Sequence, residues 1–412
     1  MAEANQPRYS SGNPRPDAPK ALGGLRVLDF STVLAGPLCA GLLGEFGAEV
    51  IKVEQPGVGD TLRQITVQDL PLWWLVEARN KRSITLNLRV PEGQDLAKKL
   101  ITKSDVLVEN FLPGTMAKWN LGYDQVRAVN PKIIFASVSG YGQTGPYRQK
   151  YAYDRVAVAM GGWAYVTGEP DRPPSRPGIA LADYATGFVA ALGVVTSLYH
   201  RDAQGGGGQQ VDASLLDTAI RMSEALMPAY DKLGVIRERM GNRHPSMAPG
   251  DHYRTRDNQW VSLNAGSDRI FPRLIQLMDR PDLLKDPRFA TAGARIKHNA
   301  EINDIVAEWV AEQDRDDLVR WLEEVGVPGG PIYTAKDMVA DPHFIEREMV
   351  VEIDDPTAGR LKMQGITPKL SETPGRIERP APTMGEANRD IYCGLLGLSE
   401  ADLERLTKAG VI

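Results

Sequence analysis

Cysteine is scarce in this sequence, with only Cys39 and Cys393 among 412 residues. The two lie far apart, and neither belongs to a CxxC motif or to a cluster of cysteines and histidines. This pattern excludes a disulfide-stabilised fold and a cysteine-ligated zinc site. It is typical of a protein that works in a reducing compartment, so we predict a cytoplasmic location.

The sequence also lacks a concentration of one charge and a long hydrophobic run. Its net charge is −5, from 48 Lys and Arg against 53 Asp and Glu. Without a basic face to displace counterions from phosphates, we expect no nucleic-acid partner. No apolar run approaches the roughly 20 residues that cross a bilayer, and residues 1–20 are polar and proline-rich. We therefore predict a disordered leader over 1–20 and no membrane association.

Several catalytic motifs are absent. The sequence has no GxSxG, HExxH or GxxxxGK[ST] motif, and no GxGxxG follows its first predicted strand. These absences argue against an α/β-hydrolase, a zinc protease, a P-loop enzyme and a dinucleotide-dependent dehydrogenase. No two of the five histidines have the spacing of metal ligands, so we predict no metal site.

Strand and helix patterns alternate through the front half of the chain. Residues 25–30 have the aliphatic and β-branched character of a buried strand, a helix begins at Pro37 and ends at Gly47, and residues 49–54 form the next strand. Such a βαβ unit implies parallel pairing through a right-handed crossover. Further strands are predicted at 83–88, 105–109 and 132–137, and helices at 155–162, 184–200 and 213–227. The predicted fold class is α/β, with a Rossmann-like, doubly wound parallel sheet.

The pattern changes near residue 227. Residues 251–264 alternate as in a hairpin, and helices are predicted near 269–278, 300–312 and 315–325. A strand at 349–353 and helices at 388–395 and 399–408 follow. At roughly 150 residues per domain, we predict two domains: a large α/β domain over 21–226 and a smaller α+β domain over 227–330, with a C-terminal segment, 331–412, that returns to the large domain.

Asp183 stands out because five uncharged residues precede it and a strongly apolar helix follows it. One interpretation is a helix N-cap, a role in which Asp stabilises a helix by about 1 kcal/mol. The other is a catalytic acid. The two are compatible, because a helix N-terminus also favours an ionised and hence nucleophilic carboxylate. Since such a sheet binds ligands beyond the carboxyl ends of its strands, we expect the site among the loops 31–37, 55–59, 88–89, 110–114 and 139–149.

Eight short motifs then occur in one order along the chain. They are GLRVLDF (24–30), LAGP (34–37), GAEVIKVE (47–54), NKRS (80–83), DVLVENF (105–111) with PG (113–114), SGYG (139–142), YD (153–154) and AD (182–183). In this combination the sequence resembles the class III CoA-transferases, the family of formyl-CoA transferase and carnitine CoA-transferase, which also includes the α-methylacyl-CoA racemases. The resemblance runs from about residue 22 to 225 and continues more weakly to the end.

The resemblance implies an acyl-CoA:carboxylate CoA-transferase in which Asp183 is the nucleophile. Its carboxylate would attack the thioester carbonyl and form a mixed anhydride, and CoA would then be held as an aspartyl-CoA thioester. A donor such as succinyl-CoA and an organic acid acceptor are expected. No tightly bound cofactor is implied, because the CoA thioester is itself a substrate.

The resemblance also implies where the CoA thioester binds. Backbone amides near Leu34 and Ala35 would stabilise oxyanions. Arg89 and Lys118 are the candidates for phosphate binding, and Gln55 stands where the best-known relatives have arginine. The positions similar to the family's CoA contacts are Gln55, Leu86, Asn87, Leu88, Arg89, Asn110, Phe111, Leu112, Lys118, Tyr151, Tyr153 and Asp154.

Three other functions remain open. An α-methylacyl-CoA racemase or epimerase needs a base on each side of the α-carbon, but Tyr153 stands where those relatives have histidine. A CoA-binding subunit beside an active partner in a heteromeric transferase is a second possibility. Intramolecular transfer between the two carboxyl groups of one dicarboxylic acid is the third, and it would use the same residues.

Substrate and assembly are predicted more coarsely. Arg148, Arg172 and Arg176 lie in loops that we expect near the site, which favours a dicarboxylic acid. By resemblance, the protein is a homodimer of two interlocked chains, or a heteromer with a paralogous subunit.

Overall fold

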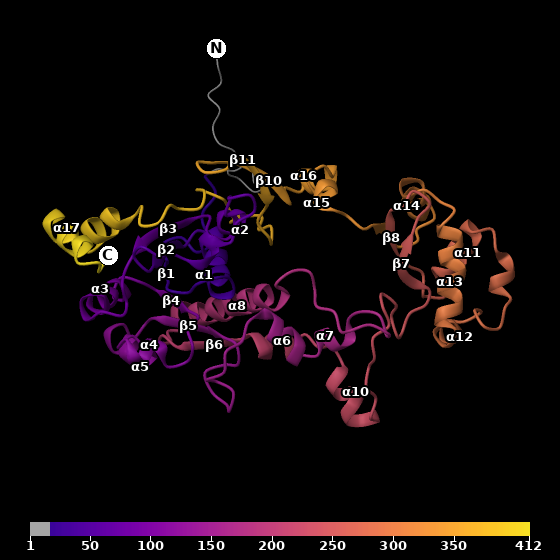
Figure 1. Ribbon diagram of the computed structural model, residues 1–412, viewed down its shortest axis with the longest axis horizontal. Coiled ribbons are helices and arrows are strands. Elements are labelled where there is room, and N and C mark those ends of the chain that lie inside the picture. The colour runs from indigo at the N-terminus through magenta and orange to yellow at the C-terminus, as the bar shows by residue number, and fades with distance from the viewer. Residues whose placement is uncertain (1–16) are drawn as a thin grey trace, which may run out of the picture. The chain divides into compact units, whose positions relative to one another are not determined.

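The computed structural model describes residues 17–412 and divides into two compact units (Figure 1). Unit 1 runs to Gly162 and also contains Pro177–Glu224 and Val339–Ile412. Unit 2 consists of Trp163–Arg176 and Ala225–Met338. Most of the predicted leader lies outside the described residues, but the backbone of Ala18 accepts a hydrogen bond from Arg376 at 2.9 Å.

Unit 1 is built on a six-stranded parallel sheet. Its order is β3-β2-β1-β4-β5-β6, that of the Rossmann fold, and all five pairings are parallel. The predicted Rossmann-like fold is therefore confirmed. The strands are β1 (Arg26–Asp29), β2 (Glu49–Glu54), β3 (Lys81–Thr85), β4 (Val106–Glu109), β5 (Ile134–Ser139) and β6 (Gln210–Ser214).

Helices cover both faces of this sheet. On one face, α1 (Ala35–Glu45) and α8 (Leu181–Ala203) pack together, and Gly187 of α8 lies against Leu38 and Ala35 of α1. On the other face, one hydrophobic core joins the sheet to helices from both ends of the chain. These helices are α3 (Pro91–Ile101), α4 (Thr115–Lys118), α5 (Tyr123–Val129), the π-helical turn η3 (Asp390–Leu395) and α17 (Glu400–Lys408).

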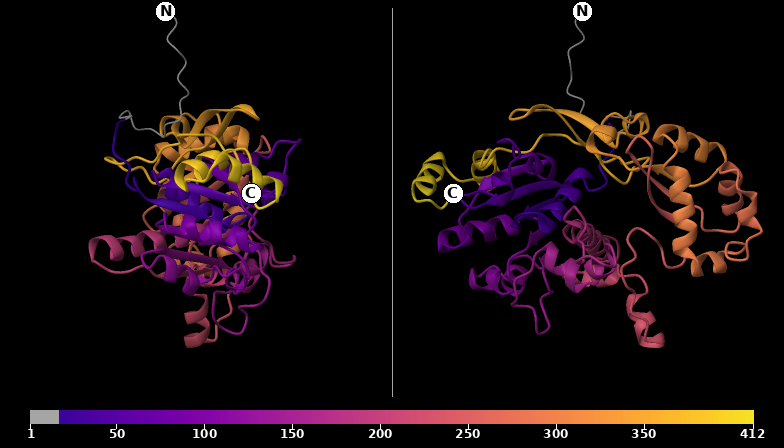
Figure 2. Two further views of the ribbon diagram at one scale, coloured as in Figure 1. Left: turned by 90° about the vertical axis from the view of Figure 1, so that its left-hand side faces the viewer. Right: turned by 45° about the vertical axis from the view of Figure 1, so that its right-hand side comes forward.

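The C-terminal segment is part of unit 1. Figures 1 and 2 show the yellow end of the chain beside the indigo and violet strands. Tyr392 is fully buried, and its hydroxyl donates to the carbonyl of Thr85 at 2.7 Å. The last residues also pair with the site-bearing loop after β3, because the N–H of Asn87 donates to the carbonyl of Val411. The C-terminal residues thus support the edge of the sheet formed by β3.

The remaining elements of unit 1 surround the sheet. The helices α6 and α9 pack on α8, and the antiparallel hairpin β10–β11 has its own small apolar core. These elements are η1 (Thr61–Gln64), α2 (Leu72–Glu77), α6 (Asp154–Met160), α9 (Leu215–Arg221), α16 (Pro342–Glu346), β10 (Val350–Asp355) and β11 (Gly359–Gln364).

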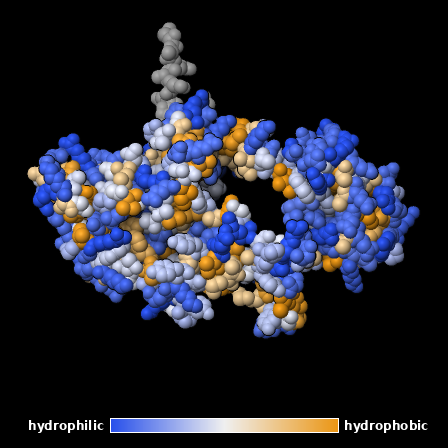
Figure 3. Space-filling model, viewed as in Figure 1, coloured by the Kyte–Doolittle hydropathy of each residue, from blue (hydrophilic) through white to orange (hydrophobic). Residues whose placement is uncertain are grey.

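Unit 2 is a smaller α+β body. A three-stranded antiparallel sheet packs against α11, α13 and α14 around a core of aliphatic and aromatic side chains. Figure 3 shows that the visible surface over these helices is largely hydrophilic, whereas apolar atoms gather over α10. Its elements are α7 (Trp163–Val166), α10 (Leu226–Leu233), β7 (Gly250–Arg254), β8 (Trp260–Asn264), α11 (Phe271–Leu277), η2 (Pro281–Leu284), α12 (Ala292–Lys297), α13 (Asn299–Val310), α14 (Arg315–Glu324), β9 (Gly329–Pro331) and α15 (Ala335–Met338).

Two predictions about single segments were wrong. The helix expected over 213–227 is instead the end of β6 followed by the short α9, because Ser214 caps a new helix by accepting from the N–H of Asp217. The statement that no apolar run approaches membrane-spanning length fails for α8, which is long and apolar enough by length and composition alone. A core helix meets the same criteria, and one face of α8 packs on α1, β5 and β6.

Candidate active site

The candidate site lies where the sheet changes direction. The strands β1 and β4 are neighbours, yet the chain leaves β1 toward β2 on one side and β4 toward β5 on the other. Such a switch point opens a crevice beyond the carboxyl ends of the strands. A cavity of 180 Å³ lies here, lined by residues that follow β1, β4 and β5 and by Asp183 of α8. Its lining residues are Thr32, Val33, Leu34, Ala35, Asn110, Val138, Ser139, Gly140, Ala152, Tyr153, Asp183 and Leu215.

Asp183 enters this cavity from the first turn of α8. The helix begins at Leu181, and its N-cap residue, Ala180, offers no capping side chain. Asp154 supplies the cap instead, because its Oδ1 accepts hydrogen bonds from the N–H of Ala182 at 2.7 Å and the N–H of Asp183 at 3.4 Å. The N-cap interpretation of Asp183 is therefore wrong, and its carboxyl group is left to face the cavity.

The surroundings of Asp183 disfavour its charged form. Burial raises the pKa of the carboxyl group, and the nearby charge of Asp154 raises it further, to about 7. The sequence had suggested that the helix N-terminus would keep this acid ionised. That expectation fails because burial and a second carboxylate outweigh the favourable helix end.

The first turn of α1 also lines the cavity. Leu34 is the N-cap of α1 and Ala35 its first residue, so their N–H groups have no partner within the helix. Gly36 allows the backbone to approach closely here: a Cβ at this position would lie 2.5 Å from the Cβ of Ser31. A carboxyl group and the amide end of a helix thus line one small cavity.

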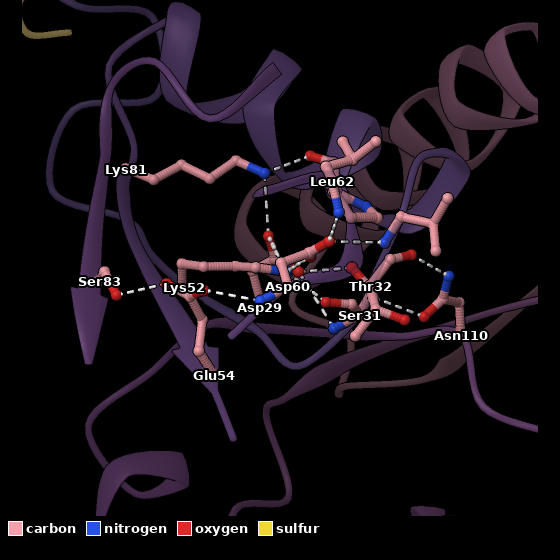
Figure 4. A network of polar contacts seen from close by, with 12 residues as sticks. Asp29, Ser31, Thr32, Lys52, Glu54, Asp60, Leu62, Lys81, Ser83 and Asn110 are labelled. Atoms are coloured by element: carbon pink, nitrogen blue, oxygen red, sulfur yellow. Dashed lines mark hydrogen bonds and ion pairs between the residues drawn. The ribbon is translucent and has the colours of Figure 1, made fainter. Parts of the chain in front are cut away.

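The turn that leads into α1 is strained and tightly held (Figure 4). Val33 has φ of +67°, a conformation rarely adopted by a β-branched residue. On one side, Asn110 bridges Thr32, with its Oδ1 accepting from the Thr32 N–H at 2.8 Å and its Nδ2 donating to the Thr32 carbonyl at 2.7 Å. On the other side, Asp60 Oδ1 accepts from the Val33 N–H at 3.1 Å.

A buried network of charges lies beneath this turn (Figure 4). Lys52 Nζ lies 2.8 Å from Asp60 Oδ2, and Lys81 Nζ lies 2.9 Å from Asp29 Oδ2. Lys52 also donates to the carbonyl of Ser31, whose hydroxyl donates to Asp29. Burial alone would raise the pKa of Asp29, but Lys52 and Lys81 hold it below its usual value. The network is balanced in charge, which explains how four ionised groups remain inside the protein.

A second cavity, of 290 Å³, adjoins the same network. Lys52 and Asp60 line it together with apolar side chains from the loops after β1, β3 and β4. Five of the predicted CoA contacts line it: Gln55, Leu86, Leu88, Arg89 and Phe111. Asn87 belongs to the same loop, where its Oδ1 accepts from the N–H of Arg89 at 3.1 Å.

The structure places the other predicted residues less uniformly. Leu34, Ala35, Asn110, Tyr153 and Asp183 line the first cavity, and Asp154 caps the helix beside it. Leu112 lines a third, smaller cavity with Glu109. Lys118, at the end of α4, and Tyr151 are exposed and line none of the three. Arg172 and Arg176 belong to unit 2, whereas Arg148 belongs to unit 1.

No metal centre accompanies these residues in the part of the chain that the structure describes. Among residues 17–412, no group of three or more His, Cys, Asp or Glu side chains could hold a metal ion.

With this geometry in view, comparison with known proteins decides the family. The sequence model of CoA-transferase family III matches residues 22–388. The chain belongs to CoA-transferase family III. The predicted resemblance is thus confirmed, and the chain is a CoA-transferase, an enzyme that acts on CoA thioesters.

Individual relatives of this CoA-transferase match over nearly their whole length. Succinyl-CoA–D-citramalate CoA-transferase of Chloroflexus aurantiacus is 46% identical over 96% of this chain and 98% of its own. The beta subunit of succinyl-CoA–L-malate CoA-transferase from the same organism is 42% identical over 95% and 98%. A crystal structure of a CAIB/BAIF family protein from Brucella suis has a TM-score of 0.81 and 35% identity, and the match covers 91% of this chain and 99% of that one.

Sequence reasoning missed several residues that shape the site of this CoA-transferase. Lys52 and Asp60 were not predicted, nor was Trp119, which lines the larger cavity. Thr32 and Val33 lie in the predicted loop 31–37 but were not singled out. A signal for the charged residues was present. In the parallel register Asp29 lies opposite Lys52, so two neighbouring buried strands carry opposite charges that have to be paired.

Proposed function

We propose that this CoA-transferase moves CoA from succinyl-CoA or a similar donor to a second organic acid through covalent intermediates on Asp183. The observation that carries the proposal is the cavity shared by the Asp183 carboxyl group and the first turn of α1. A nucleophile and oxyanion-stabilising amides are the two components that acyl transfer requires.

The steps of the transfer balance without an external base or oxidant. The Asp183 carboxylate attacks the thioester carbonyl, the C–S bond breaks, and CoA thiolate leaves a mixed anhydride. The thiolate then attacks the Asp183 carbonyl of that anhydride, which releases the donor acid and forms the aspartyl-CoA thioester. The acceptor carboxylate attacks the aspartyl carbonyl of this thioester, which releases CoA thiolate and forms a second mixed anhydride. The thiolate then attacks the acceptor carbonyl of that anhydride, which forms the acceptor-CoA thioester and frees the Asp183 carboxylate.

The environment of Asp183 suits this role. A half-buried carboxylate whose pKa is raised to about 7 is more basic than an exposed one and is stripped of part of its water shell. In each step negative charge develops on a carbonyl oxygen. The N–H groups of Leu34 and Ala35, at the positive end of α1, would stabilise that charge.

We propose that the larger cavity receives part of the CoA moiety. Phe111, Trp119 and the leucines at 86 and 88 offer apolar surface, while Arg89 offers a cation at the rim for a phosphate. Gln55 also lines this cavity but is neutral. Arg89 is therefore the cationic residue among the predicted CoA contacts that line it. Lys118 and Tyr151 would contact the CoA moiety from exposed positions outside this cavity.

The names of two relatives suggest which acids serve as donor and acceptor of CoA. Those two proteins are named for succinyl-CoA with D-citramalate and with L-malate. For this chain we propose succinyl-CoA as donor and a hydroxylated dicarboxylic acid as acceptor. Arg148, which belongs to unit 1, is the proposed partner of the second carboxylate. Replacing Arg148 with Ala should then weaken the preference for dicarboxylic over monocarboxylic acids, and an unchanged preference would remove Arg148 from this role.

We further propose that the working enzyme contains two chains in the cytoplasm. The outer side of α8 carries an apolar stripe at helical spacing, formed by Phe188, Leu192, Val195 and Tyr199, all exposed in the single chain. On α10, Met227, Tyr230 and Leu233 are exposed as well. Such surfaces fit a second chain. Light scattering of the purified protein should give twice the monomer mass, and a monomer at micromolar concentration would contradict this.

A second candidate function follows from the relative that is named as a beta subunit. In that case the chain would bind CoA beside an active partner and would need the partner for turnover. The test below separates the two functions, because a subunit without its own nucleophile chemistry leaves Asp183 unmodified.

The test is covalent trapping. The protein is mixed with succinyl-CoA, hydroxylamine is added, and intact-protein and peptide mass spectrometry locate any hydroxamate. We expect the hydroxamate at Asp183. Asp183→Asn is the negative control, and Glu109→Gln is the matched control, because Glu109 is a buried acid with a pKa also raised to about 7 that does not line the Asp183 cavity. A protein that consumes succinyl-CoA in the presence of acceptors without labelling Asp183 would overturn the covalent route.

A further inference from the structure

Val33 is the strained residue at the entrance to α1. Its φ of +67° is unfavourable for a β-branched side chain, and it directly precedes Leu34, the N-cap of α1. Strain of this kind persists only where the surrounding structure enforces it. The residues that enforce it therefore also decide where the N–H groups of Leu34 and Ala35 lie.

Two polar side chains hold this turn, and each is itself held. Asp60 is buried, and its Oδ1 accepts from the N–H groups of both Val33, at 3.1 Å, and Leu62, at 2.9 Å. The other oxygen of Asp60 is paired with Lys52. Asp60 is thus a rigid support on the side of β2.

Asn110 holds the turn from the side of β4. Its side-chain amide bonds to both the N–H and the carbonyl of Thr32, the residue before Val33, at 2.8 and 2.7 Å. Thr32 follows β1 and Asn110 follows β4, so this pair bridges the two strands at the switch point of the sheet (Figure 4). The Thr32 carbonyl and the Val33 N–H belong to one peptide group, which Asn110 holds at the oxygen and Asp60 at the nitrogen, so this peptide cannot rotate without losing a hydrogen bond.

We propose that Asn110 is a positioning residue for the transfer reaction. Together with Asp60 it keeps Val33 in the left-handed conformation, and this conformation aims the amides of Leu34 and Ala35 at the carbonyl that Asp183 attacks. The inference rests on the proposed function, which assigns the oxyanion to those amides. It assigns to the Asn110 side chain a role different from that of a direct contact to CoA.

A double-mutant experiment separates these roles. Asn110→Ala removes both bonds to Thr32 and lets Val33 relax to negative φ, so kcat should fall by about tenfold to a hundredfold, with a smaller change in KM for succinyl-CoA. Val33→Gly added to Asn110→Ala should recover at least about fivefold in kcat, because glycine adopts positive φ without strain. If the Asn110 side chain only contacted CoA, its removal would raise KM for succinyl-CoA, and adding Val33→Gly would not restore activity.

Asn130→Ala is the matched control. The Asn130 side chain also bridges two backbone segments, donating to the carbonyls of Ile101 and Ser104 at 2.8 Å, but it lines none of the cavities at the site. It should lower the melting temperature without changing kcat. A loss of kcat in Asn110→Ala with no rescue by Val33→Gly, or an unchanged kcat in Asn110→Ala, would overturn the inference while leaving the proposed function intact.

Failure of the proposed function would look different. In that event the wild-type protein would neither transfer CoA nor form the Asp183 hydroxamate, and the assigned role of Asn110 would fall with it. A readout independent of activity accompanies the kinetics. Val33→Gly should raise the melting temperature more in the wild-type background, where the strain is enforced, than in Asn110→Ala, and equal shifts would count against the proposal.

Discussion

Asp154 Oδ1 accepts a hydrogen bond from the backbone N–H of Asp183, so one carboxylate fixes the helix end that presents the other. The same contact brings a second negative charge close to the Asp183 carboxyl group, and this charge adds to burial in raising its pKa to about 7. Asp154 therefore affects both the position and the protonation of the proposed nucleophile.

A pH profile should report this coupling. Only the ionised Asp183 is nucleophilic, and its pKa is raised, so kcat/KM should fall as the pH drops below about 7. Asp154→Asn removes the neighbouring charge but keeps an oxygen that can cap α8, so the acidic limb should move to lower pH. Initial rates with succinyl-CoA between about pH 5 and 9 measure it. An acidic limb at the same pH in both proteins would exclude coupling between these two acids.

Glu109 should make folding depend on pH. Burial raises its pKa from 4.5 to about 7 in the folded chain. An acid whose pKa is higher in the folded chain contributes fully to stability below pH 4.5. This contribution is lost as the pH rises through 7, because the carboxyl group ionises more easily in the unfolded chain. Glu109→Gln keeps the shape without the charge.

The Glu109→Gln protein should therefore be more stable above pH 7 by about 3 kcal/mol. The difference should shrink toward zero near pH 4.5. Urea unfolding at several pH values measures this free energy. An equal difference at all pH values would show that packing, and not ionisation, distinguishes the two side chains.

Asp183 should oppose stability while it serves activity. Its pKa is raised from 3.8 to about 7, so ionising it in the folded chain costs free energy at neutral pH. Asp183→Asn should raise the free energy of unfolding at about pH 8 by roughly 2 kcal/mol and lower CoA transfer by about 10⁴-fold or more. Parallel urea titrations and rate assays test both effects, and a destabilised but active variant would contradict the assignment.

Two glycines of α1 should respond oppositely to alanine. A Cβ at Gly36 would lie 2.5 Å from the Cβ of Ser31, so Gly36→Ala has to displace the first turn of α1 and should lower both kcat and stability. At Gly41 the nearest atom is the carbonyl oxygen of Glu77 at 3.5 Å, an ordinary contact. Gly41→Ala should preserve activity and stabilise the helix by up to about 1 kcal/mol. Thermal unfolding and steady-state rates provide the comparison.

The fold could be predicted from local patterns to a large extent. The strands at 25–30, 49–54 and 105–109 correspond to β1, β2 and β4, because a buried parallel strand reads as a short aliphatic run. The strand β6 was missed, since its residues QVDAS are mixed in character and only β5 beside it makes them a strand. The long pattern over α8 was recognised as a helix, although its Asp154 cap comes from 27 residues before its first residue, Leu181.

The family and the proposed nucleophile can be recognised in the sequence alone, because ordered motifs and the acid before an apolar helix are local features. The presentation of that acid, the cause of its raised pKa and the side chains that hold the first turn of α1 depend on the three-dimensional fold. Asn110, Asp60 and Lys52 come from separate strands and loops and meet at the switch point of the sheet. Asp154, the first residue of α6, caps the start of α8 beside them. Their hydrogen bonds and charges act over a few ångströms in space, and no spacing along the chain encodes such distances.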